Sequence, residues 1–533
     1  MTTFTPWLSG LAGTAAVIPA VFGSASLLAP ARRAPLELAT RAAALAFALA
    51  LLIGAGYGVA ALAGAPLAPA ASALGLRLDV VTAAMLVLVT GLALVISRYS
   101  QRYLHGDPGQ ARYARWLLAT LAAVATLVIT ANLWVLAAAW LATSIALHQL
   151  LTFYADRPAA LVAAHKKFLV SRLADACMLA AIALLSGEVG SARLDAIERW
   201  ASAQSVLSGS AQTAAVLFVV AVALKSAQLP FHGWLMQVME APTPVSALLH
   251  AGVVNIGGFL MIRLAPLMVR AELAQLLLIG IGLITTLFAA LVMTTRVSVK
   301  VALAWSTCAQ MGFMLVQCGL GMWHLALLHL VAHSLYKAHA FLASGGTVDG
   351  WRVQALLAPS PPASLRRALA AVALVGASVG GVVYAELLVL GRALHENPTL
   401  LPLALVLALG LVPFTYHALA GATLRSAAFY TLGFSALYFG WHEAFRHALV
   451  APVPSATATL GSALVAVGFA ALFIVQLRLQ GNRNGRLARA LHPLLFAGFY
   501  LDELFTRVTF LIWPPRFPAR EPATSTRIVT VEA

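Results

Sequence analysis

The stretch Leu276-Leu-Leu-Ile-Gly-Ile-Gly-Leu-Ile-Thr-Thr-Leu-Phe-Ala-Ala-Leu-Val-Met293 runs for 18 residues without a charged side chain. An α-helix needs about 20 apolar residues to cross the hydrocarbon core of a bilayer. Similar runs recur along the whole sequence: Ala42–Ala63, Val80–Ile96, Leu117–Leu136, Thr213–Leu224, Ala368–Leu390, Leu400–Ala420 and Leu460–Gln476. Their Ala, Leu, Val and Gly content favours helices over the alternating strands of a membrane barrel. We therefore expect an all-α polytopic membrane protein with about 13–15 transmembrane helices.

The composition of the whole chain supports a membrane location. Of 533 residues, 61% are hydrophobic and 10% are charged, whereas soluble domains carry about 25% charged residues. The net charge of +16 comes largely from Arg clusters in short connections, namely Arg98, Arg102, Arg112 and Arg115, and Arg478, Arg483, Arg486 and Arg489. Such clusters mark cytoplasmic loops. We expect a multi-pass protein of the cell inner membrane that contacts lipid and does not bind nucleic acid.

No Ser/Gly linker or charged low-complexity block divides the chain, so the sequence predicts one transmembrane domain over residues 5–478. The segment 479–518 begins with basic residues and continues with aromatic, apolar and acidic ones. We expect it to form either an interfacial helix or a last membrane span. Asp502 and Glu503 are expected to contact a partner or to pack along the membrane surface. Residues 519–533 are polar and are expected to be disordered.

Lysine is the most informative residue type, because the chain has five Lys and 29 Arg. Arg stays protonated inside proteins, whereas a buried Lys can exist in both protonation states, as a proton relay requires. Lys225 ends one apolar run and Lys337 lies inside another, Leu325–Leu342. A charge at the bilayer centre costs at least about 2.5 kcal/mol, so these two lysines indicate function. Lys300 is either a further relay residue or an anchor that reaches the membrane surface.

The sequence His329-Leu-Val-Ala-His333-Ser-Leu-Tyr-Lys337 places three titratable side chains at a spacing of four residues. On a helix they lie on nearly one face, about 6 Å apart per step. Imidazoles exchange protons near neutral pH, so the pattern predicts a file for proton transfer. Two His at this spacing could instead bind zinc. No acidic residue or third His flanks them at ligand spacing, and we expect no metal site in this chain.

A second group of candidate residues surrounds a predicted break in the helices. Pro230 follows Lys225 and frees backbone carbonyls, which is tolerable only where protein or water can satisfy them. Glu240 and the prolines after it mark the start of the next helix. His250 lies one to two turns inside that helix and could be the relay station that follows Lys225.

Further charged residues lie at the starts of other apolar runs. Lys167 opens a helix on which Arg172 and Asp175 are three residues apart and can pair. Asp79 directly precedes another span. We consider each of these residues, and Glu240, equally suited to a structural ion pair and to a gate of the pathway.

Several stretches between Asp79 and Gly345 resemble the antiporter-like subunits of respiratory complex I and of multisubunit cation/proton antiporters. They are Lys225-Ser-Ala-Gln, Ala241-Pro-Thr-Pro-Val-Ser-Ala-Leu-Leu-His250, Trp305-Ser-Thr-Cys-Ala-Gln-Met-Gly312, and His329 to Lys337 with Phe341-Leu-Ala-Ser-Gly345. The resemblance implies about fourteen helices with two inverted five-helix repeats that contain broken helices. It also implies a proton or cation relay through Lys225, His250, Lys300, His329, His333 and Lys337.

Two departures from that family pattern affect the expected function. Leu141 follows Trp140 at the place where the family's proton pumps have a Glu. The second half of the chain has a Pro interruption at Pro413 but no Lys near it, so His417 is its relay candidate. Both departures argue against an autonomous pump of the complex I type.

The run Thr143-Ser-Ile-Ala-Leu-His148-Gln-Leu-Leu151 and the tail Phe499-Tyr-Leu-Asp-Glu-Leu-Phe-Thr-Arg507 resemble the membrane subunits of two-component inorganic-carbon accumulation systems. This resemblance implies a transporter subunit and not an enzyme. Protons or Na⁺ would pass along its Lys/His relay and drive CO₂ hydration in a large zinc-binding partner, so no cofactor is expected in this chain. The alternative is a proton-translocating subunit of a quinone-reducing respiratory complex.

Overall fold

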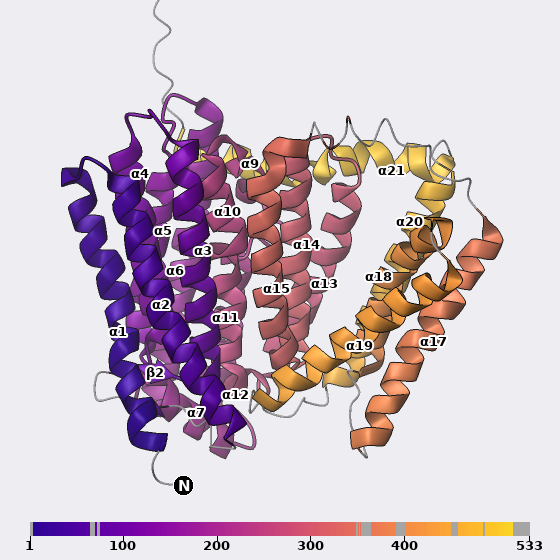
Figure 1. The fold of residues 1–533 in the computed structure, drawn as a ribbon, viewed down its shortest axis with the longest axis horizontal. Helices are drawn as coiled ribbons and strands as arrows, with labels where there is room; N and C mark the ends of the chain where they lie inside the picture. The colour runs from indigo at the N-terminus through magenta and orange to yellow at the C-terminus, as the bar shows by residue number, and fades with distance from the viewer. Residues whose placement is uncertain are drawn as a thin grey trace, which may run out of the picture.

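The computed structural model describes residues 4–63, 70–71, 75–347, 350, 352, 364–390, 400–421, 423–448, 457–482 and 485–514. The expected all-α polytopic fold is confirmed: twelve of the described helices are long and apolar enough to cross a membrane. The tail 519–533, which we expected to be disordered, lies outside the described residues. Figure 1 shows most helices running side by side between two faces.

The N-terminal part forms one side of the molecule (Figure 1). Its elements are α1 (Phe4–Leu28), η1 (Ala29–Ala31), α2 (Pro35–Leu62), β1 (Ala70–Ala71), β2 (Arg77–Leu78), α3 (Val80–Tyr103), α4 (Gln110–Ile129), α5 (Leu133–Leu151), α6 (Pro158–Val189) and α7 (Leu194–Ala203). The two short strands pair antiparallel. The apolar run Leu117–Leu136, which we expected to be one span, is divided between α4 and α5. Asn132 is the reason, because its side chain accepts hydrogen bonds from the first backbone N–H groups of α5.

The central part contains the helices that carry most of the candidate residues. Its elements are α8 (Gly209–Lys225), α9 (Gly233–Gln237), η2 (Val238–Glu240), α10 (Thr243–Ala251), η3 (Val253–Asn255), α11 (Ile256–Arg263), α12 (Ala265–Met268), α13 (Glu272–Met293), α14 (Val299–Gly319), α15 (Trp323–Leu342) and η4 (Ala343–Gly346). Helix α15 is not among the twelve apolar helices because its His and Lys residues lower its hydropathy, yet it runs the length of the bundle (Figure 1).

Two interruptions between helices in this central part lie against each other. The first separates α8 from α9, and the second separates α10 from α11. The Ser226 hydroxyl of the first interruption donates to the Val254 carbonyl of the second, at 3.2 Å. The Cys308 thiol on α14 donates to the Ala227 carbonyl, also at 3.2 Å. Side chains therefore donate hydrogen bonds to backbone carbonyls at these interruptions. Within a membrane such carbonyls must find partners inside the protein.

In the C-terminal part, helices α17 to α20 lean away from the central helices, whereas α21 lies across them (Figure 1). Its elements are α17 (Leu365–Leu390), α18 (Leu400–Gly421), α19 (Leu424–Ala448), α20 (Thr457–Gly481), α21 (Arg486–Phe496), η6 (Gly498–Tyr500) and α22 (Leu501–Ile512). Pro413 lies inside the continuous helix α18 and does not end it, in contrast to Pro230 in the first half. A spanning helix tolerates one missing hydrogen bond at a proline.

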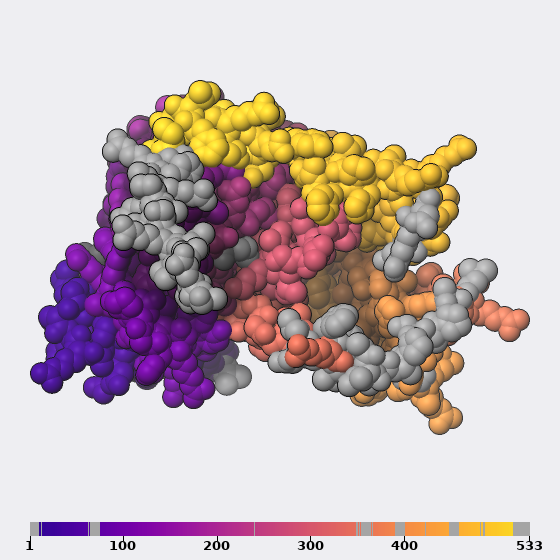
Figure 2. Space-filling view, turned by 90° about the horizontal axis from the view of Figure 1, so that it is seen from above, coloured from indigo at the N-terminus to yellow at the C-terminus, as the bar shows by residue number. Residues whose placement is uncertain are grey.

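The tail helices α21 and α22 have 11 and 12 residues, too few to span a bilayer. They lie across one face of the bundle, where Figure 2 shows the C-terminal segment extending over the ends of other helices. Arg296, just after α13, holds α21 in place by donating to the Leu495 carbonyl at 2.6 Å. The tail thus forms two short helices where the sequence allowed an interfacial helix or a last membrane span.

Helices α13 and α14 approach closely at two glycines. A Cβ atom on Gly282 would lie 2.5 Å from the Gly312 carbonyl oxygen, and one on Gly312 would lie 2.6 Å from the Gly282 carbonyl oxygen. The contact is backbone to backbone, so neither side can yield by rotating a side chain. Small residues commonly permit such contacts between membrane helices.

We predict that Gly282→Ala lowers the free energy of unfolding by about 1–3 kcal/mol, because the added methyl group pushes α13 and α14 apart. Thermal unfolding of the purified protein measures this. Gly280→Ala on the same helix is the matched control, since nothing lies within 4 Å of its Cβ position. Equal melting temperatures for the two variants would contradict the prediction.

Candidate functional site

Three titratable side chains of α15 are each hydrogen-bonded to α14. His329 Nδ1 lies 2.9 Å from Gln317 Oε1, and His333 Nδ1 lies 2.5 Å from Gln310 Oε1. The Lys337 ammonium donates to the Ser306 hydroxyl at 2.7 Å and to the Leu303 carbonyl at 3.1 Å. His333 and Lys337 are buried, and His329 is half-buried. The predicted face of α15 thus forms a polar ladder with α14 that extends about 12 Å along α15.

His250 on α10 joins this ladder from the neighbouring broken helix. The second ring nitrogen of His333 lies 3.2 Å from the His250 carbonyl oxygen. The His250 ring is fully buried, stacks on Phe341 with ring centroids 4.3 Å apart, and has Nδ1 3.1 Å from the Thr307 hydroxyl oxygen. The structure therefore brings His250, His333 and Lys337 together, although they come from two separate stretches of sequence.

Lys225 and Lys167 form a second buried group. Lys225 is the last residue of α8, and its ammonium lies 4.6 Å from the centroid of the Trp140 ring and 3.5 Å from the Trp140 carbonyl oxygen. Lys167 on α6 donates to the Ser144 carbonyl and hydroxyl at 2.7 and 2.9 Å. Both lysines are held by α5, which supplies an aromatic face and neutral oxygens but no carboxylate.

Arg172 and Asp175 lie further along α6 and form an ion pair, with Arg172 Nη2 2.7 Å from Asp175 Oδ2. The Asp175 side chain is 12% exposed, so the pair is largely withdrawn from solvent. It provides the nearest carboxylate on the helix that carries Lys167.

The remaining candidates lie outside the buried ladder. The Lys300 ammonium donates to the Thr243 hydroxyl at 2.8 Å, so Lys300 joins the starts of α14 and α10. Glu240 is half-exposed and faces Arg157 at 3.7 Å, which is a weak surface pair. His417 is exposed on α18. Its exposure differs from the buried position that we expected for a relay residue, because α18 continues as a helix through Pro413 and leaves no polar break there.

Sequence reasoning missed the neutral side chains that are hydrogen-bonded to the Lys and His residues. Gln310, Gln317, Ser306 and Ser144 carry no charge and are spread over two helices. Gln317 and Gln310 are seven residues apart, and Ser306 lies four residues before Gln310, so all three fall on one face of α14. That spacing of polar residues within an apolar helix could have indicated a polar face on α14.

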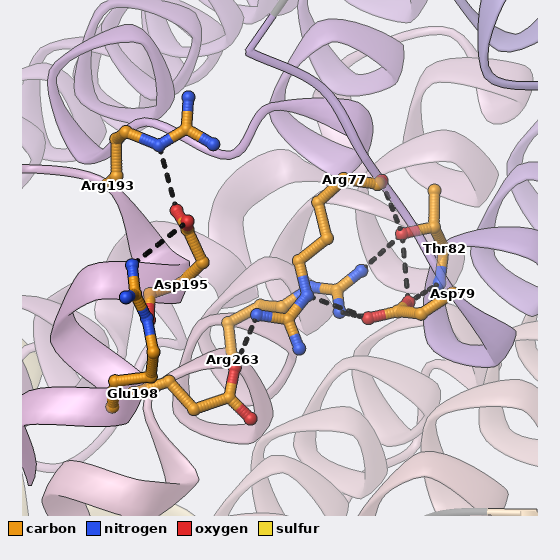
Figure 3. A network of polar contacts seen from close by, with 8 residues as sticks. Arg77, Asp79, Thr82, Arg193, Asp195, Glu198 and Arg263 are labelled. Carbon is orange, nitrogen blue, oxygen red and sulfur yellow. Dashed lines mark hydrogen bonds and ion pairs between the residues drawn. The ribbon is translucent and has the colours of Figure 1, made fainter. Parts of the chain in front are cut away.

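Asp79 is the centre of a separate buried network, shown in Figure 3. It caps α3 and pairs with Arg263 of α11 at 2.5 Å and with Arg77 of β2 at 2.8 Å. Arg77 also pairs with Glu198 of α7 at 2.8 Å. The network joins four elements at one end of the helices, which supports a structural role for Asp79. Burial alone raises the pKa of the Asp79 carboxyl, but Arg263 and Arg77 outweigh burial and hold that pKa below its usual range.

We predict that Asp79→Asn lowers the free energy of unfolding by about 3–5 kcal/mol, because the Arg263 charge is left buried without its partner. Asp195→Asn is the matched control in the same region (Figure 3) and is expected to cost about 0–1 kcal/mol, since Asp195 pairs with Arg193 at the surface. Because the folded-state pKa of Asp79 is depressed, its stabilising contribution is present above about pH 4 and disappears as the pH falls further. Thermal unfolding of both variants at neutral and acidic pH measures the difference; similar losses in both would contradict it.

The tail helix α22 is tied to α6 beside the lysine group. Asp502 accepts hydrogen bonds from the Lys166 ammonium at 2.8 Å and from the Gln237 amide at 3.0 Å. The Lys166 side chain has no solvent exposure. A Cβ atom on Gly233 would overlap Asp502, so the approach requires glycine at that position. Trp513 completes the contact by stacking on His165 at 4.0 Å between ring centroids.

We predict that Asp502→Asn releases α22, because a hydrogen bond between charged groups contributes about 1.5–3 kcal/mol. Trypsin cleavage at Arg507 of α22 would then accelerate by about tenfold or more. Glu503→Gln is the control, since Glu503 is the exposed acidic neighbour of Asp502. Unchanged cleavage of the Asp502 variant would show that the ion pair does not hold the helix.

Comparisons with known proteins identify the family of this chain. The family model of the NADH:quinone oxidoreductase/Mrp antiporter transmembrane region matches residues 130–411, and that of the complex I chain 5 N-terminus matches residues 67–114. A probable inorganic carbon transporter subunit DabB2 of Halothiobacillus neapolitanus is 41% identical over 86% of this chain and 84% of its own length. A probable DabB of Hydrogenovibrio crunogenus is 39% identical over 82% of this chain and 83% of its own length.

Solved structures show the same relationship. A chain of the Mrp complex from Dietzia sp. DQ12-45-1b has a TM-score of 0.56 and 27% identity; the match covers 97% of this chain and 58% of the Mrp chain. A chain of an archaeal membrane-bound sulfane sulfur reductase shares the fold with a TM-score of 0.55 at 15% identity, over 92% of this chain and 99% of that chain. The protein is therefore a multi-pass membrane transporter subunit of the NADH:quinone oxidoreductase/Mrp antiporter family, in the group that contains the DabB inorganic carbon transporter subunits.

Proposed function

We propose that this chain is the energy-coupling membrane subunit of an inorganic-carbon accumulation complex in the cell inner membrane. Protons or Na⁺ move through its buried Lys/His relay, and this movement drives CO₂ hydration in a large DabA-like partner. The partner, and not this chain, holds the catalytic zinc. The carrying observation is the hydrogen-bonded ladder from His329 to Lys337, found in a chain that is 41% identical to a named inorganic carbon transporter subunit.

The hydrogen bonds of His250 suit proton transfer. The Thr307 hydroxyl donates to the Leu303 carbonyl at 3.0 Å, so its oxygen is left to accept from His250 Nδ1–H. In that tautomer His250 Nε2 carries a lone pair, and this buried atom has no hydrogen-bond partner. A neutral imidazole with one bonded N–H and one available lone pair can accept a proton from a neighbouring group.

His333 is arranged differently. Both of its ring nitrogens face oxygen atoms that accept hydrogen bonds, Gln310 Oε1 and the His250 carbonyl. An imidazolium with two N–H groups would find an acceptor for each. The ring centroids of His329 and His333 are 5.9 Å apart, a distance that one bridging water can span. We infer that His333 can receive a proton and that His329 can take it onward.

The two lysines differ in what compensates their charge. Lys337 has two oxygen acceptors on α14, whereas Lys225 faces the Trp140 ring. A cation over an indole face gains about 0.5–2 kcal/mol, less than a buried carboxylate would provide. No carboxylate is hydrogen-bonded to Lys225, and Leu141 stands where the resembling proton pumps have a Glu. This difference supports a site that serves a partner instead of an autonomous pump.

The alternative function is a proton-translocating subunit of a quinone-reducing respiratory complex. It is favoured by 35% identity to NADH-quinone oxidoreductase subunit L of Rhodobacter capsulatus, over 51% of this chain and 41% of that protein. Among the described residues no carboxylate accepts a hydrogen bond from Lys225 or Lys167, although the Asp175 charge lies near both. The missing direct carboxylate partner weighs against this alternative. This alternative would be favoured if the chain purified with redox subunits and without a zinc protein.

We predict that Lys337→Ala and Lys225→Ala abolish growth rescue when this chain and its partner are expressed in carbonic-anhydrase-deficient cells kept in ordinary air. Lys337→Arg should fail as well, because Arg keeps the charge but does not release a proton. His339→Ala is the control, since His339 is exposed on the same helix. Partner binding and membrane insertion are measured for every variant. Rescue by the lysine variants at the wild-type level would overturn the relay role.

A further inference from the structure

A second cluster of titratable side chains lies where α15, α17 and α19 meet. Glu386 of α17 and His442 and Glu443 of α19 each offer one ligand atom, and these atoms lie within 4.8 Å of one another. His442 Nδ1 is 3.5 Å from Glu386 Oε1 and 3.5 Å from Glu443 Oε1. None of these residues belongs to the Lys/His ladder.

The cluster is buried and has unused bonding capacity. The side chains of His442, Glu386 and Glu443 are 9%, 10% and 19% exposed. His442 Nδ1 and Glu386 Oε2 are both buried and make no hydrogen bond. A buried polar atom that makes no hydrogen bond destabilises the folded protein. One ligand atom from each of the three residues lies within 4.8 Å of the other two, so the cluster can surround a positively charged ligand.

We propose that Glu386, His442 and Glu443 bind Zn²⁺ or a similar divalent first-row metal ion. Zinc is bound through imidazole nitrogen and carboxylate oxygen at about 2.0–2.2 Å, which places tetrahedral ligand atoms about 3.3 Å apart. The two distances of 3.5 Å from His442 Nδ1 are close to that edge. Imidazole is a poor ligand for the hard cations Na⁺ and Mg²⁺, so the donor set selects a transition metal or zinc.

The surroundings of the cluster match those of a metal site. The ring of His324, on α15, lies 4.7 Å from that of His442 between centroids, and its buried Nε2 has no hydrogen-bond partner. His324 can therefore supply a fourth ligand after a small movement. Arg446 donates to both oxygens of Glu443, at 2.5 to 3.0 Å, and hydrogen bonds of this kind orient carboxylates that bind metals. The two carboxylates offset two positive charges, so a divalent ion together with Arg446 would leave the cluster with one positive charge.

The proposed ion would cross-link the two halves of the molecule. The end of α19 that bears His442 reaches towards the start of α15, whereas α17, α18 and α20 lean away (Figure 1). A metal bonded to α15, α17 and α19 would fix that junction. This role is structural, does not depend on the proposed coupling function, and departs from our expectation of no metal in this chain. The rival state is an ion pair of protonated His442 with the two carboxylates, without metal.

The test measures bound zinc in the purified full-length chain. Samples are equilibrated with a low concentration of free Zn²⁺, freed of unbound ion and analysed by mass spectrometry. Wild type is expected to hold about one zinc ion per chain at this site, and Glu386→Gln and His442→Ala are expected to lose it. His417→Ala, an exposed histidine of the same C-terminal part, is the control and should keep it.

A second measurement does not depend on the folding of a variant. Wild-type protein loaded with Co²⁺ should show the visible absorption of a tetrahedral site with nitrogen and oxygen ligands, without a thiolate band. Its displacement by Zn²⁺ should be complete. Absence of that spectrum in wild type, or equal zinc content in wild type and the Glu386 and His442 variants, would overturn the proposal and leave the metal-free ion pair.

Discussion

A polar group buried among membrane helices must find its partner within the protein, and the α14–α15 ladder is where this constraint acts most strongly. The hydrogen-bond partners of His329, His333 and Lys337 are Gln317, Gln310 and Ser306, respectively. Without those neutral partners the charged forms of the α15 side chains would be too costly to populate. With them, the same side chains can change protonation state without losing their positions. The ladder therefore satisfies buried polar groups, and in the proposed function the same side chains move ions.

The rest of the structure holds that ladder in place. The close contact of Gly282 with Gly312 keeps α13 against α14. The two interruptions between helices in the central part place His250 beside His333. The Asp79 network fixes the far end of α11, the second half of the broken helix that follows His250. On the opposite face, Asp502 connects the tail helix to Lys166, next to Lys167. A partner that moved the tail could thereby alter the lysine group directly.

The sequence predicted the fold class, because apolar length is a local signal. The spacing of Lys and His likewise predicted that His329, His333 and Lys337 share one face of α15, whereas their role as a relay stays a prediction. It did not show where Leu117–Leu136 divides, since a short cap at Asn132 interrupts an otherwise apolar run. Nor did it show that His417 is exposed or that Asp502 meets Lys166, which lies 336 residues away. Glu386 and His442 are likewise distant in sequence, so no motif spacing pointed to their cluster. Contacts of that kind depend on packing between helices.

The most direct test of the central claim follows CO₂ hydration by the purified two-subunit complex in liposomes while ion gradients are imposed across the membrane. If the buried file couples ion movement to the partner's chemistry, bicarbonate formation should rise with an inward gradient of protons or Na⁺. It should stop when both gradients are collapsed. Hydration that continues at an unchanged rate after both gradients are removed would contradict the account.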